Sequence, residues 1–361
     1  MLKLKPLGVG IIGCGRIFDL NVLGYLQTDK AKIVALCDSR GVRAKKKAKE
    51  YGLSEAKIYR DYKDLLKDEQ VDMVEILLPH YLHKEVAVAA AEAGKHVSVQ
   101  KPPAMNVKEM DEMISAARKA GVKFKVYENF IFYPPYRKAK ELMDAGEIGN
   151  PHMIRIKMTS GSVECGWEVP LEAWMWRFTP EQCGGGPTIW DDGYHKFSIA
   201  RYFMGDVDKV FAWIETTELG PGLCLDSPAI IMWKYKSPGK LGVWDTSFAP
   251  EMKIKSKYYG TDERVEITGT KGYIWINQCT GQLLDIPSVI MYKDGELTCF
   301  ENLRCDWADS FIDSTLHFID AILEDKEPIL SGEEGKKVLQ FALAALKSAE
   351  THKEVSPDEI K

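Results

Sequence analysis

The first 128 residues alternate short, almost entirely apolar segments with longer amphipathic ones. The apolar segments are LGVGII, KIVALC, DMVEILL, HVSVQ and KFKVY. A strand that is apolar along its whole length is buried on both faces, as in parallel sheets that helices cover on either side. Gly94 and Gly121 each follow a helical segment, at the place where a helix C-terminus favours glycine. This pattern predicts a doubly wound α/β domain.

The rest of the chain differs, because apolar and polar residues alternate within its strand-like segments. These segments are PHMIRIKMTS, VFAWIETTE, AIIMWKY, KLGVWDTSF, RVEITGTKGYIWIN and SVIMYKDGELTCF. Such alternation, with Gly, Pro and Asp turns between segments, is typical of an antiparallel sheet with one covered face. Helical periodicity returns in residues 309–327 and 334–350, and a chain of 361 residues exceeds most single cores. We expect two domains: residues 1–128, and an α+β domain with a large, mostly antiparallel open sheet over residues 129–361.

Charge and cysteine content exclude several classes of protein. The net charge is −5 with both signs mixed along the chain, which gives no reason to expect nucleic acid or an anionic membrane as partner. The N-terminal segment lacks the features of a signal peptide, and no apolar segment has the length of a membrane-spanning helix. The eight cysteines form no C-x-x-C pair, so neither a disulfide framework nor a zinc site is expected. We expect a cytoplasmic protein with reduced thiols and no bound metal.

A glycine-rich loop, Gly13–Gly15, lies between the first expected strand and the next helix. Backbone N–H groups and the helix dipole at such a turn favour a pyrophosphate. Asp38 ends the second expected strand, where a carboxylate accepts hydrogen bonds from the ribose of NAD and repels a 2′-phosphate. Arg40 lies close enough to pair with such a phosphate, so NADP is the alternative. The arrangement predicts a Rossmann dinucleotide-binding domain, although Phe18 replaces the third small residue of the fingerprint. The alternative is a strand-helix turn that needs glycine only for steric reasons, but this alternative leaves Asp38 unexplained.

The segment GGGPTIWDDGYH contains two adjacent carboxylates followed by an imidazole. A helix beginning near Ile189 places Asp191 and His195 on one face, since side chains four residues apart stack along a helix. An imidazole ionises near neutral pH, so His195 suits a general base, and Asp191 can orient it or bind a substrate hydroxyl. Gly193 inside this helix costs about 1 kcal/mol relative to alanine, which indicates a close approach to its backbone. The alternative is that His195 is a buried core histidine and Asp191 a helix cap. A metal site at Asp191 and His195 would need further ligands, and none is evident in the sequence.

Three segments resemble the Gfo/Idh/MocA family of oxidoreductases. LLPHYLHKEVAVAAAEAGKHVSVQKPPA resembles two strand-helix units in which a T-P-N-like turn, a histidine and an E-K-P motif line the nicotinamide pocket. GGPTIWDDGYH resembles the family's G-G-G-x-x-x-D-x-G-x-H stretch, and KELMDAGEIGNPHMIRIK its junction between domains. The resemblance covers nearly the whole chain and implies that Lys101, Asp191 and His195 are catalytic. The chain departs from the family where Gln100 replaces a glutamate, which removes a negative charge beside Lys101, and where His80 replaces an asparagine.

The motifs and the resemblance together give two sets of candidate binding residues. The candidate dinucleotide contacts are Gly13, Gly15, Arg16, Ile17, Asp38, Ser39, Arg40, Pro79, His80, His83, Gln100, Lys101, Pro102, Asn129, Trp176 and Arg177. The candidate substrate contacts are Glu128, Tyr133, Arg177 and Asp192. Glu128 has an open alternative as a solvated charge at a strand end, and Asp192 as a charge at the helix start.

Tryptophan is frequent near the expected catalytic helix. Five of the nine tryptophans lie in or beside this stretch: Trp167, Trp174, Trp176, Trp190 and Trp213. Aromatic faces pack on the C–H faces of sugars, which fits a carbohydrate or cyclitol substrate, and the resemblance implies the same class. The alternative is that most of these side chains fill the core or a subunit interface.

We therefore expect an NAD(P)-dependent oxidoreductase that transfers a hydride between the nicotinamide and a secondary alcohol or carbonyl of a sugar, a sugar derivative or a cyclitol. His195 is the expected base, assisted by Asp191 and Lys101. The alternatives are an NAD-dependent glycosidase or lyase that uses transient oxidation, and a non-catalytic dinucleotide-binding regulator. The apolar face of an open sheet further predicts a homodimer or homotetramer.

Overall fold

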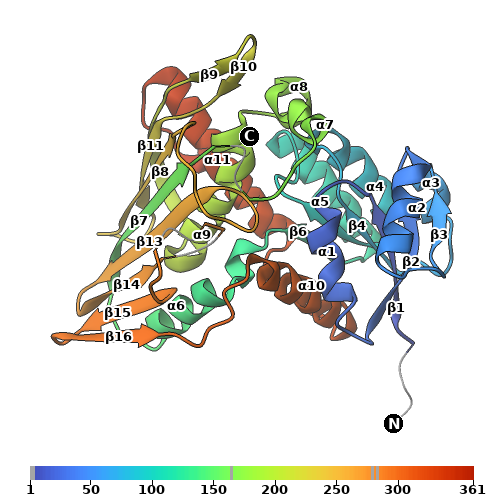
Figure 1. Ribbon diagram of the computed structural model, residues 1–361, viewed down its shortest axis with the longest axis horizontal. Helices are drawn as coiled ribbons and strands as arrows, with labels where there is room; N and C mark the ends of the chain where they lie inside the picture. Colours follow the sequence, from blue (N-terminus) through green and yellow to red (C-terminus); the bar gives the residue numbers. More distant parts are fainter. Residues whose placement is uncertain (1–4, 163–165, 278–279, 282–283) are drawn as a thin grey trace. The chain divides into compact units, whose positions relative to one another are not determined.

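The computed structural model describes residues 5–162, 166–277, 280–281 and 284–361, so Cys165 and Cys279 lie outside the described residues. The chain divides into two compact units (Figure 1). The first consists of Met1–Glu128, Thr179–Gly184 and Phe311–Leu339, and the second of Asn129–Phe178, Gly185–Ser310 and Gln340–Lys361. Within the described ranges, no helix is both long and apolar enough to cross a membrane.

A parallel sheet forms the centre of the first unit; in the part that the structure describes it has six strands in the order β3-β2-β1-β4-β5-β6. The strands are β1 (Leu7–Ile12), β2 (Ala31–Cys37), β3 (Lys57–Tyr59), β4 (Met73–Ile76), β5 (His96–Gln100) and β6 (Phe124–Tyr127). The helices are α1 (Phe18–Tyr25), α2 (Gly41–Glu50), α3 (Tyr62–Leu66), η1 (His80–Leu82), α4 (His83–Glu92), α5 (Val107–Ala120) and α8 (Pro180–Cys183). The predicted doubly wound sheet is confirmed, and β3 is a short edge strand that the apolar pattern did not predict. Ligands of such sheets bind where the strand order reverses, here beside the carboxyl ends of β1 and β4.

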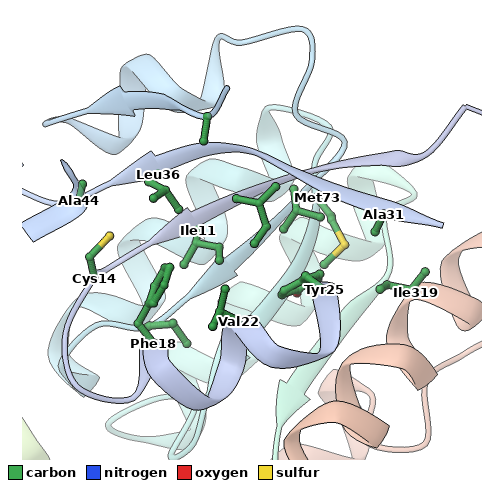
Figure 2. Packing of buried hydrophobic residues seen from close by; sticks show 14 of the residues in the cluster. Ile11, Cys14, Phe18, Val22, Tyr25, Ala31, Leu36, Ala44, Met73 and Ile319 are labelled. Carbon is green, nitrogen blue, oxygen red and sulfur yellow. The ribbon is translucent and has the colours of Figure 1, made fainter. Parts of the chain in front are cut away.

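Helix α1 is held against the sheet by apolar side chains (Figure 2). Phe18 and Val22 of α1 are fully buried and share one cluster with Ile11 of β1 and Met73 of β4. The ring centroid of Phe18 lies 5.7 Å from that of Tyr51. Burying a phenyl ring stabilises by about 1.5–3 kcal/mol. A large apolar side chain thus occupies the position where a dinucleotide fingerprint usually has a small residue.

A carboxylate lies in the middle of the buried strand β4. Glu75 is 1% exposed and accepts a hydrogen bond from the Tyr25 hydroxyl at 2.5 Å. Lys125 of β6 is also fully buried, and its ammonium donates to the hydroxyl and carbonyl oxygens of Ser314 at 2.7 and 2.6 Å. Burial raises the pKa of Glu75 to about 7 and lowers the pKa of Lys125 to about 7, because each charged form loses water. The stability of this unit therefore depends on pH around neutrality.

Replacing Glu75 by glutamine is expected to flatten the pH dependence of unfolding between pH 5 and 7. The pKa of Glu75 is raised from 4.5 to about 7, so in this window the folded protein keeps a proton that the unfolded chain releases. The wild-type protein consequently loses stability as the pH rises from 5 to 7, whereas an amide does not titrate. Urea unfolding at pH 5, 6 and 7 measures the slope, with Glu55→Gln at an exposed ion pair as the control. Equal slopes in wild-type and Glu75→Gln proteins would contradict the expectation.

The second unit contains a sheet that, over the described residues, has eight strands in the order β16-β15-β14-β13-β7-β12-β11-β8. The strands are β7 (Pro151–Ser160), β8 (Val207–Ile214), β11 (Ala229–Tyr235), β12 (Leu241–Phe248), β13 (Thr261–Gly269), β14 (Gly272–Ile276), β15 (Val289–Lys293) and β16 (Glu296–Phe300). Strands β7 and β12 run parallel and the other neighbours antiparallel, which confirms a mostly antiparallel sheet. Strands β9 (Thr217–Gly220) and β10 (Leu223–Leu225) pair separately. The segment VFAWIETTE is therefore part of two strands and not of one.

The helices of the second unit lie beside this sheet (Figure 1). They are α6 (Pro134–Asp144), α7 (Leu171–Met175) and α9 (Gly193–Met204), with the short turns η2 (Phe130–Phe132), η3 (Trp176–Phe178), η4 (Pro187–Asp192) and η5 (Pro357–Glu359). Helices α10 (Trp307–Leu323) and α11 (Gly332–Thr351) contribute residues to both units. The ring of Phe197 in α9 lies 5.6 Å from Trp244 of β12 and 4.6 Å from Phe341 of α11. Aromatic packing therefore fixes α9 against the sheet.

Side chains along β11 alternate between buried and exposed, so the sheet has one covered face. Several large apolar side chains of the sheet are exposed. They are Trp213, Ile230, Met232, Leu241, Tyr273, Tyr292 and Leu297. Trp213 and Ile230 are partners on adjacent strands, so at least part of this apolar surface is continuous.

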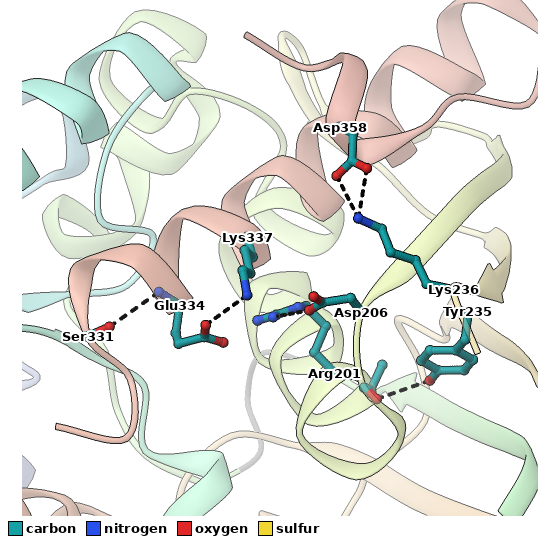
Figure 3. A network of polar contacts seen from close by, with 9 residues as sticks. Arg201, Asp206, Tyr235, Lys236, Ser331, Glu334, Lys337 and Asp358 are labelled. Atoms are coloured by element: carbon teal, nitrogen blue, oxygen red, sulfur yellow. Dashed lines mark hydrogen bonds and ion pairs between the residues drawn. The ribbon is translucent and has the colours of Figure 1, made fainter. Parts of the chain in front are cut away.

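The C-terminal end of α9 is tied to β11 and the residues around it by polar contacts (Figure 3). The Tyr235 hydroxyl donates to the carbonyl oxygen of Ala200 at 3.0 Å. Arg201 forms an ion pair with Asp206, and the Lys236 backbone N–H donates to the carbonyl of Asp206 at 2.8 Å. This end of the helix is therefore fixed independently of its beginning.

Candidate active site

The two glycines of the loop before α1 have different functions. Gly13 has φ of +102°, and a Cβ there would lie 2.2 Å from the carbonyl oxygen of Leu77, so only glycine fits. A Cβ on Gly15 would meet no atom within 4 Å, which leaves space at the start of α1. Among the described residues, no side chain caps α1: Ile17 occupies the cap position, and Arg16 pairs with Asp19 at 2.7 Å. The space and the uncapped helix start fit the pyrophosphate of a dinucleotide.

Asp38 follows β2 directly and is 9% exposed. Its Oδ2 accepts a hydrogen bond from the backbone N–H of Cys14 at 3.0 Å, and its Oδ1 from that of Arg40 at 2.8 Å. Each oxygen has a second lone pair, so the carboxylate can also accept from ribose hydroxyls. Ser39 and Arg40 are exposed beside it. Burial raises the pKa of the Cys14 thiol well above its usual range, which makes this thiol unreactive.

The turn after β4 is held by two histidines. His83 is fully buried, with Nδ1 2.9 Å from the carbonyl oxygen of Pro102 and Nε2 2.8 Å from that of Leu78. Burial lowers the pKa of His83 to about 3, so its imidazole is neutral and donates to one of the two carbonyls. Nδ1 of His80, which follows Pro79, lies 2.7 Å from the carbonyl oxygen of Cys183. His83 thus connects this turn with the turn at Pro102 through backbone atoms.

Lys101 lies just after β5, and its peptide bond to Pro102 is cis. The Gln100 side-chain oxygen accepts a hydrogen bond from the Lys101 backbone N–H at 2.9 Å. The Gln100 side-chain nitrogen is buried and has no hydrogen-bond partner among the described residues. An unsatisfied buried donor costs about 1–3 kcal/mol. This donor therefore fits a site that a bound molecule completes with an acceptor.

The helix that carries the catalytic candidates starts differently from the prediction. It begins at Pro187, two residues before Ile189, and its first turn, η4, is π-helical, with the Asp191 N–H donating to the carbonyl of Gly186 at 3.2 Å. Helix α9 then starts at Gly193. Asp191 therefore lies in the π turn, whose hydrogen bonds close over five residues, and His195 lies in α9, so the placement of both side chains on one face stays a prediction.

The predicted close approach to Gly193 is confirmed. A Cβ on Gly193 would lie 2.8 Å from the ring of Trp244. Trp244 is fully buried in β12, so the ring has no room to withdraw. Glycine at this position lets the start of α9 lie directly against the sheet.

Asp191 is held by an arginine on the neighbouring turn η3. Asp191 is 6% exposed, and its Oδ2 accepts a hydrogen bond from Nε of Arg177 at 2.5 Å. The guanidinium lies 4.4 Å above the ring of Trp176 and 5.6 Å from that of Trp174, and it also donates to the carbonyl of Ala173. The ion pair and the aromatic contacts fix the direction of the carboxylate.

His195 is 5% exposed, and its imidazole stacks on Phe130 with ring centroids 4.0 Å apart. The neighbouring Lys196 is buried, forms an ion pair with the buried Glu263 of β13, and lies 4.8 Å from the centre of the same phenyl ring. Lys196 also pairs with Asp192 at 3.0 Å. The start of α9 is therefore positioned by one aromatic stack and one buried ion pair.

The remaining candidates lie at the end of β6 and in the following turn. Glu128 is fully buried, so its interpretation as a solvated strand-end charge is wrong. The Asn129 amide donates to the Ser310 hydroxyl at 2.7 Å, and the buried Tyr133 donates to the carbonyl of Cys305 at 2.9 Å. The Tyr133 hydroxyl is thus bonded to the backbone of its own unit.

The structure brings the candidates together in two groups. The glycine loop, Asp38, the two histidine turns and Lys101 belong to the first unit, and Asp191, His195, Arg177 and Asp192 to the second. Of the five tryptophans, Trp190 is fully buried, Trp213 lies exposed in β8, and Trp174 and Trp176 flank Arg177. Trp167 packs against Tyr258 and Tyr259, with ring centroids 5.7 and 6.0 Å apart.

Sequence reasoning missed three residues that shape the second group. Phe130 lies in the segment VYENFIFYPPY, where nothing marks it as a partner of His195. Glu263 pairs with Lys196 across a distance of 67 residues. The carboxylate of Asp226 accepts hydrogen bonds from the backbone of Thr188 and Ile189 in the π turn. Residues 226–228, Asp-Ser-Pro, indicate a turn, but not which helix this turn would meet.

The fold and the loop define an NAD-binding oxidoreductase. Residues 7–128 match the oxidoreductase family with an NAD-binding Rossmann fold, Gfo/Idh/MocA, and residues 136–275 match the Gfo/Idh/MocA C-terminal domain. The chain belongs to the Gfo/Idh/MocA oxidoreductase family, as its motifs implied. It is 30% identical to the myo-inositol 2-dehydrogenase of Thermotoga maritima over 98% of this chain and 99% of that protein.

Two further proteins are similar to the chain over most of its length. The scyllo-inositol 2-dehydrogenase (NAD(+)) of Bacillus subtilis is 27% identical over 92% of each chain. An oxidoreductase from Agrobacterium radiobacter, whose crystal structure contains NAD⁺, L-tartaric acid and magnesium, superposes with a TM-score of 0.83 over 98% of both chains at 23% identity. The second likeness concerns the fold alone.

Proposed function

We propose that this protein is an NAD-dependent dehydrogenase of a sugar, a sugar derivative or a cyclitol. The observation that carries the proposal is the second group of residues, in which a buried imidazole stacks on Phe130 and a carboxylate is held by Arg177 on the preceding turn. A base and a fixed carboxylate suit a substrate with neighbouring hydroxyl groups. The inositol dehydrogenases among the relatives act on such polyols, which supports the same class here.

Each candidate has a proposed function in this reaction. NAD, when bound, supplies the hydride acceptor. His195 takes the proton of the hydroxyl that is oxidised, and the Lys101 ammonium stabilises negative charge on that oxygen. Asp191 binds a neighbouring hydroxyl or orients the imidazole, and Glu128 and Asp192 are retained as substrate contacts. Tyr133 is also retained as a substrate contact, because its hydroxyl oxygen, which donates to the carbonyl of Cys305, keeps lone pairs that can accept a hydrogen bond.

The dinucleotide is proposed to contact the glycine loop, Asp38 and the turns at Pro79 and Lys101. Asp38 favours NAD over NADP, since a buried carboxylate repels a 2′-phosphate. His83, fully buried against two carbonyls, shapes this site through the backbone. We propose residues 1–128 as the dinucleotide-binding domain and residues 129–361 as the substrate-binding and oligomerisation domain.

The exposed apolar side chains of the second unit's sheet support a homodimer or homotetramer formed through that sheet. Side chains such as Trp213 and Leu297, 51% and 65% exposed, are costly to leave in water. We also propose that the protein acts in the cytoplasm.

Turnover of one polyol class with NAD is the expected result of a substrate survey. Aldoses, uronates, inositols and simple glycosides are each incubated with NAD and, separately, with NADP, and the absorbance of the reduced nicotinamide is followed. The variant Asp38→Ala tests the cofactor preference. We expect its preference for NAD over NADP to fall by at least about tenfold, which corresponds to a change of about 1.4 kcal/mol in relative binding free energy. Release of sugar without net reduction would instead favour the glycosidase or lyase. Dinucleotide binding without any turnover would favour a regulator.

A further inference from the structure

We infer that Asp226 is a positioning residue for the catalytic helix, an inference that rests on the proposed function. Asp226 lies between β10 and β11. Its Oδ1 accepts a hydrogen bond from the Thr188 N–H at 2.8 Å, and its Oδ2 from the Ile189 N–H at 2.6 Å. The first N–H groups of a helix have no intrahelical partners, and Pro187, which begins this helix, has no N–H. A single carboxylate from a distant loop therefore caps the turn that leads to Asp191.

The residue at the local cap position cannot perform this task. Gly186 precedes Pro187 with an extended backbone and has no side chain. A Cβ on Gly186 would lie 2.2 Å from Cγ of Asp226, so glycine is required for the carboxylate to reach the turn. The local cap is thus replaced by a distant one, whose negative charge lies at the positive end of the helix dipole.

The cap acts on the π turn itself. Thr188 and Ile189 lie inside η4, whose hydrogen bond from Asp191 to Gly186 spans five residues. If this turn relaxed to α-helical hydrogen bonding, Asp191 would rotate by about 100° relative to α9, the angle of one residue in an α-helix. The far end of α9 stays bound to Tyr235 in either case. The Asp226 carboxylate therefore decides where Asp191 points with respect to Arg177, and because η4 continues directly into the first turn of α9, loss of this cap also displaces His195 on Phe130.

The test compares Asp226→Ala, Asp226→Asn and Gly186→Ala with Asp61→Ala. Asp61 caps α3 by accepting a hydrogen bond from the Lys63 N–H at 2.9 Å, so its replacement removes a helix cap in the first unit, outside the proposed site. We measure kcat and KM for the best polyol, the Kd of NADH by fluorescence, and the NMR signals of the His195 ring, assigned with His195→Ala. Stacking on Phe130 gives these ring protons a characteristic shift that misplacement changes.

Asp226→Ala is expected to lower kcat 10- to 100-fold, because a displacement of about 1 Å in an active site has a kinetic effect of this size. The Kd of NADH is expected to stay within about twofold of the wild-type value, and the His195 NMR signals are expected to move. Gly186→Ala acts in the same direction because its methyl group displaces the carboxylate, and Asp226→Asn lies in between because the amide keeps one acceptor. Asp61→Ala changes none of these quantities.

Unchanged kcat and unchanged His195 signals in folded Asp226→Ala or Asp226→Asn protein would overturn the inference. If the wild-type protein oxidises no polyol but the His195 signals move only in the Asp226 and Gly186 variants, the positioning stands and the proposed function fails. If the polyol is oxidised and the variants behave like Asp61→Ala, the function stands and the positioning fails.

Discussion

Replacement of His195 by alanine is expected to lower kcat for the preferred polyol by a factor of about 10²–10⁴, the range for loss of a positioned general base. The imidazole is 5% exposed and stacked on Phe130, so solvent has little access to replace it. The Kd of NADH is expected to stay within about twofold, because the dinucleotide loop belongs to the first unit. Initial rates at saturating NAD, with Kd from fluorescence titration, measure both quantities.

The matched control is His152→Ala, which removes an exposed imidazole from β7 in the same unit. We expect its kcat to equal that of the wild-type protein. A kcat for His195→Ala within about tenfold of wild type would remove this residue from the proposed mechanism.

Replacement of Glu263 by alanine is expected to destabilise the second unit by about 3–5 kcal/mol. Lys196 and Glu263 are 1% and 5% exposed and form an ion pair, so removal of the carboxylate leaves an ammonium buried in a medium that solvates it poorly. The half-exposed Asp192, 3.0 Å from the same ammonium, compensates only in part. The shift of the urea unfolding midpoint, followed by tryptophan fluorescence, measures the loss.

Glu141→Ala is the control, because Glu141 pairs with Lys138 on the surface of α6 and such pairs contribute about 1 kcal/mol or less. The double variant Lys196→Met, Glu263→Leu is expected to recover most of the stability, since apolar side chains of similar volume replace buried ion pairs well. A loss below about 1 kcal/mol in Glu263→Ala, or a double variant less stable than Glu263→Ala, would contradict the assignment of a buried pair.

Much of the first unit could be predicted because its signals are local. Apolar strands, Gly94 and Gly121 at helix ends, and the glycine loop each depend on residues close in the sequence. The structure adds the reason that residue 13 must be glycine: a Cβ on Gly13 would lie 2.2 Å from the carbonyl oxygen of Leu77. Strand β3 was missed because three residues at a sheet edge are too few for a periodic pattern.

The second unit shows where local reasoning fails. The close approach to Gly193 was predicted, but its cause, Trp244, lies on a strand some 50 residues later. The helix start was predicted near Ile189, two residues after Pro187, but neither its π-helical first turn nor the cap that Asp226 supplies from outside the segment was predicted. Glu128, expected at a strand end with two open interpretations, is buried because of packing that its neighbours in sequence do not reveal.

The sequence by itself determined the two folds, the glycine loop after the first strand and the family, because strand periodicity, turn residues and motif spacing are properties of short stretches of chain. Only the tertiary structure decided which partner each charged or aromatic side chain meets: Arg177 with Asp191, Phe130 with His195, and Glu263 with Lys196. These contacts depend on the distance between side chains in space, and burial makes them strong by excluding water. The order of residues in the sequence does not give these distances, because they arise only when distant segments of the chain pack together in the fold.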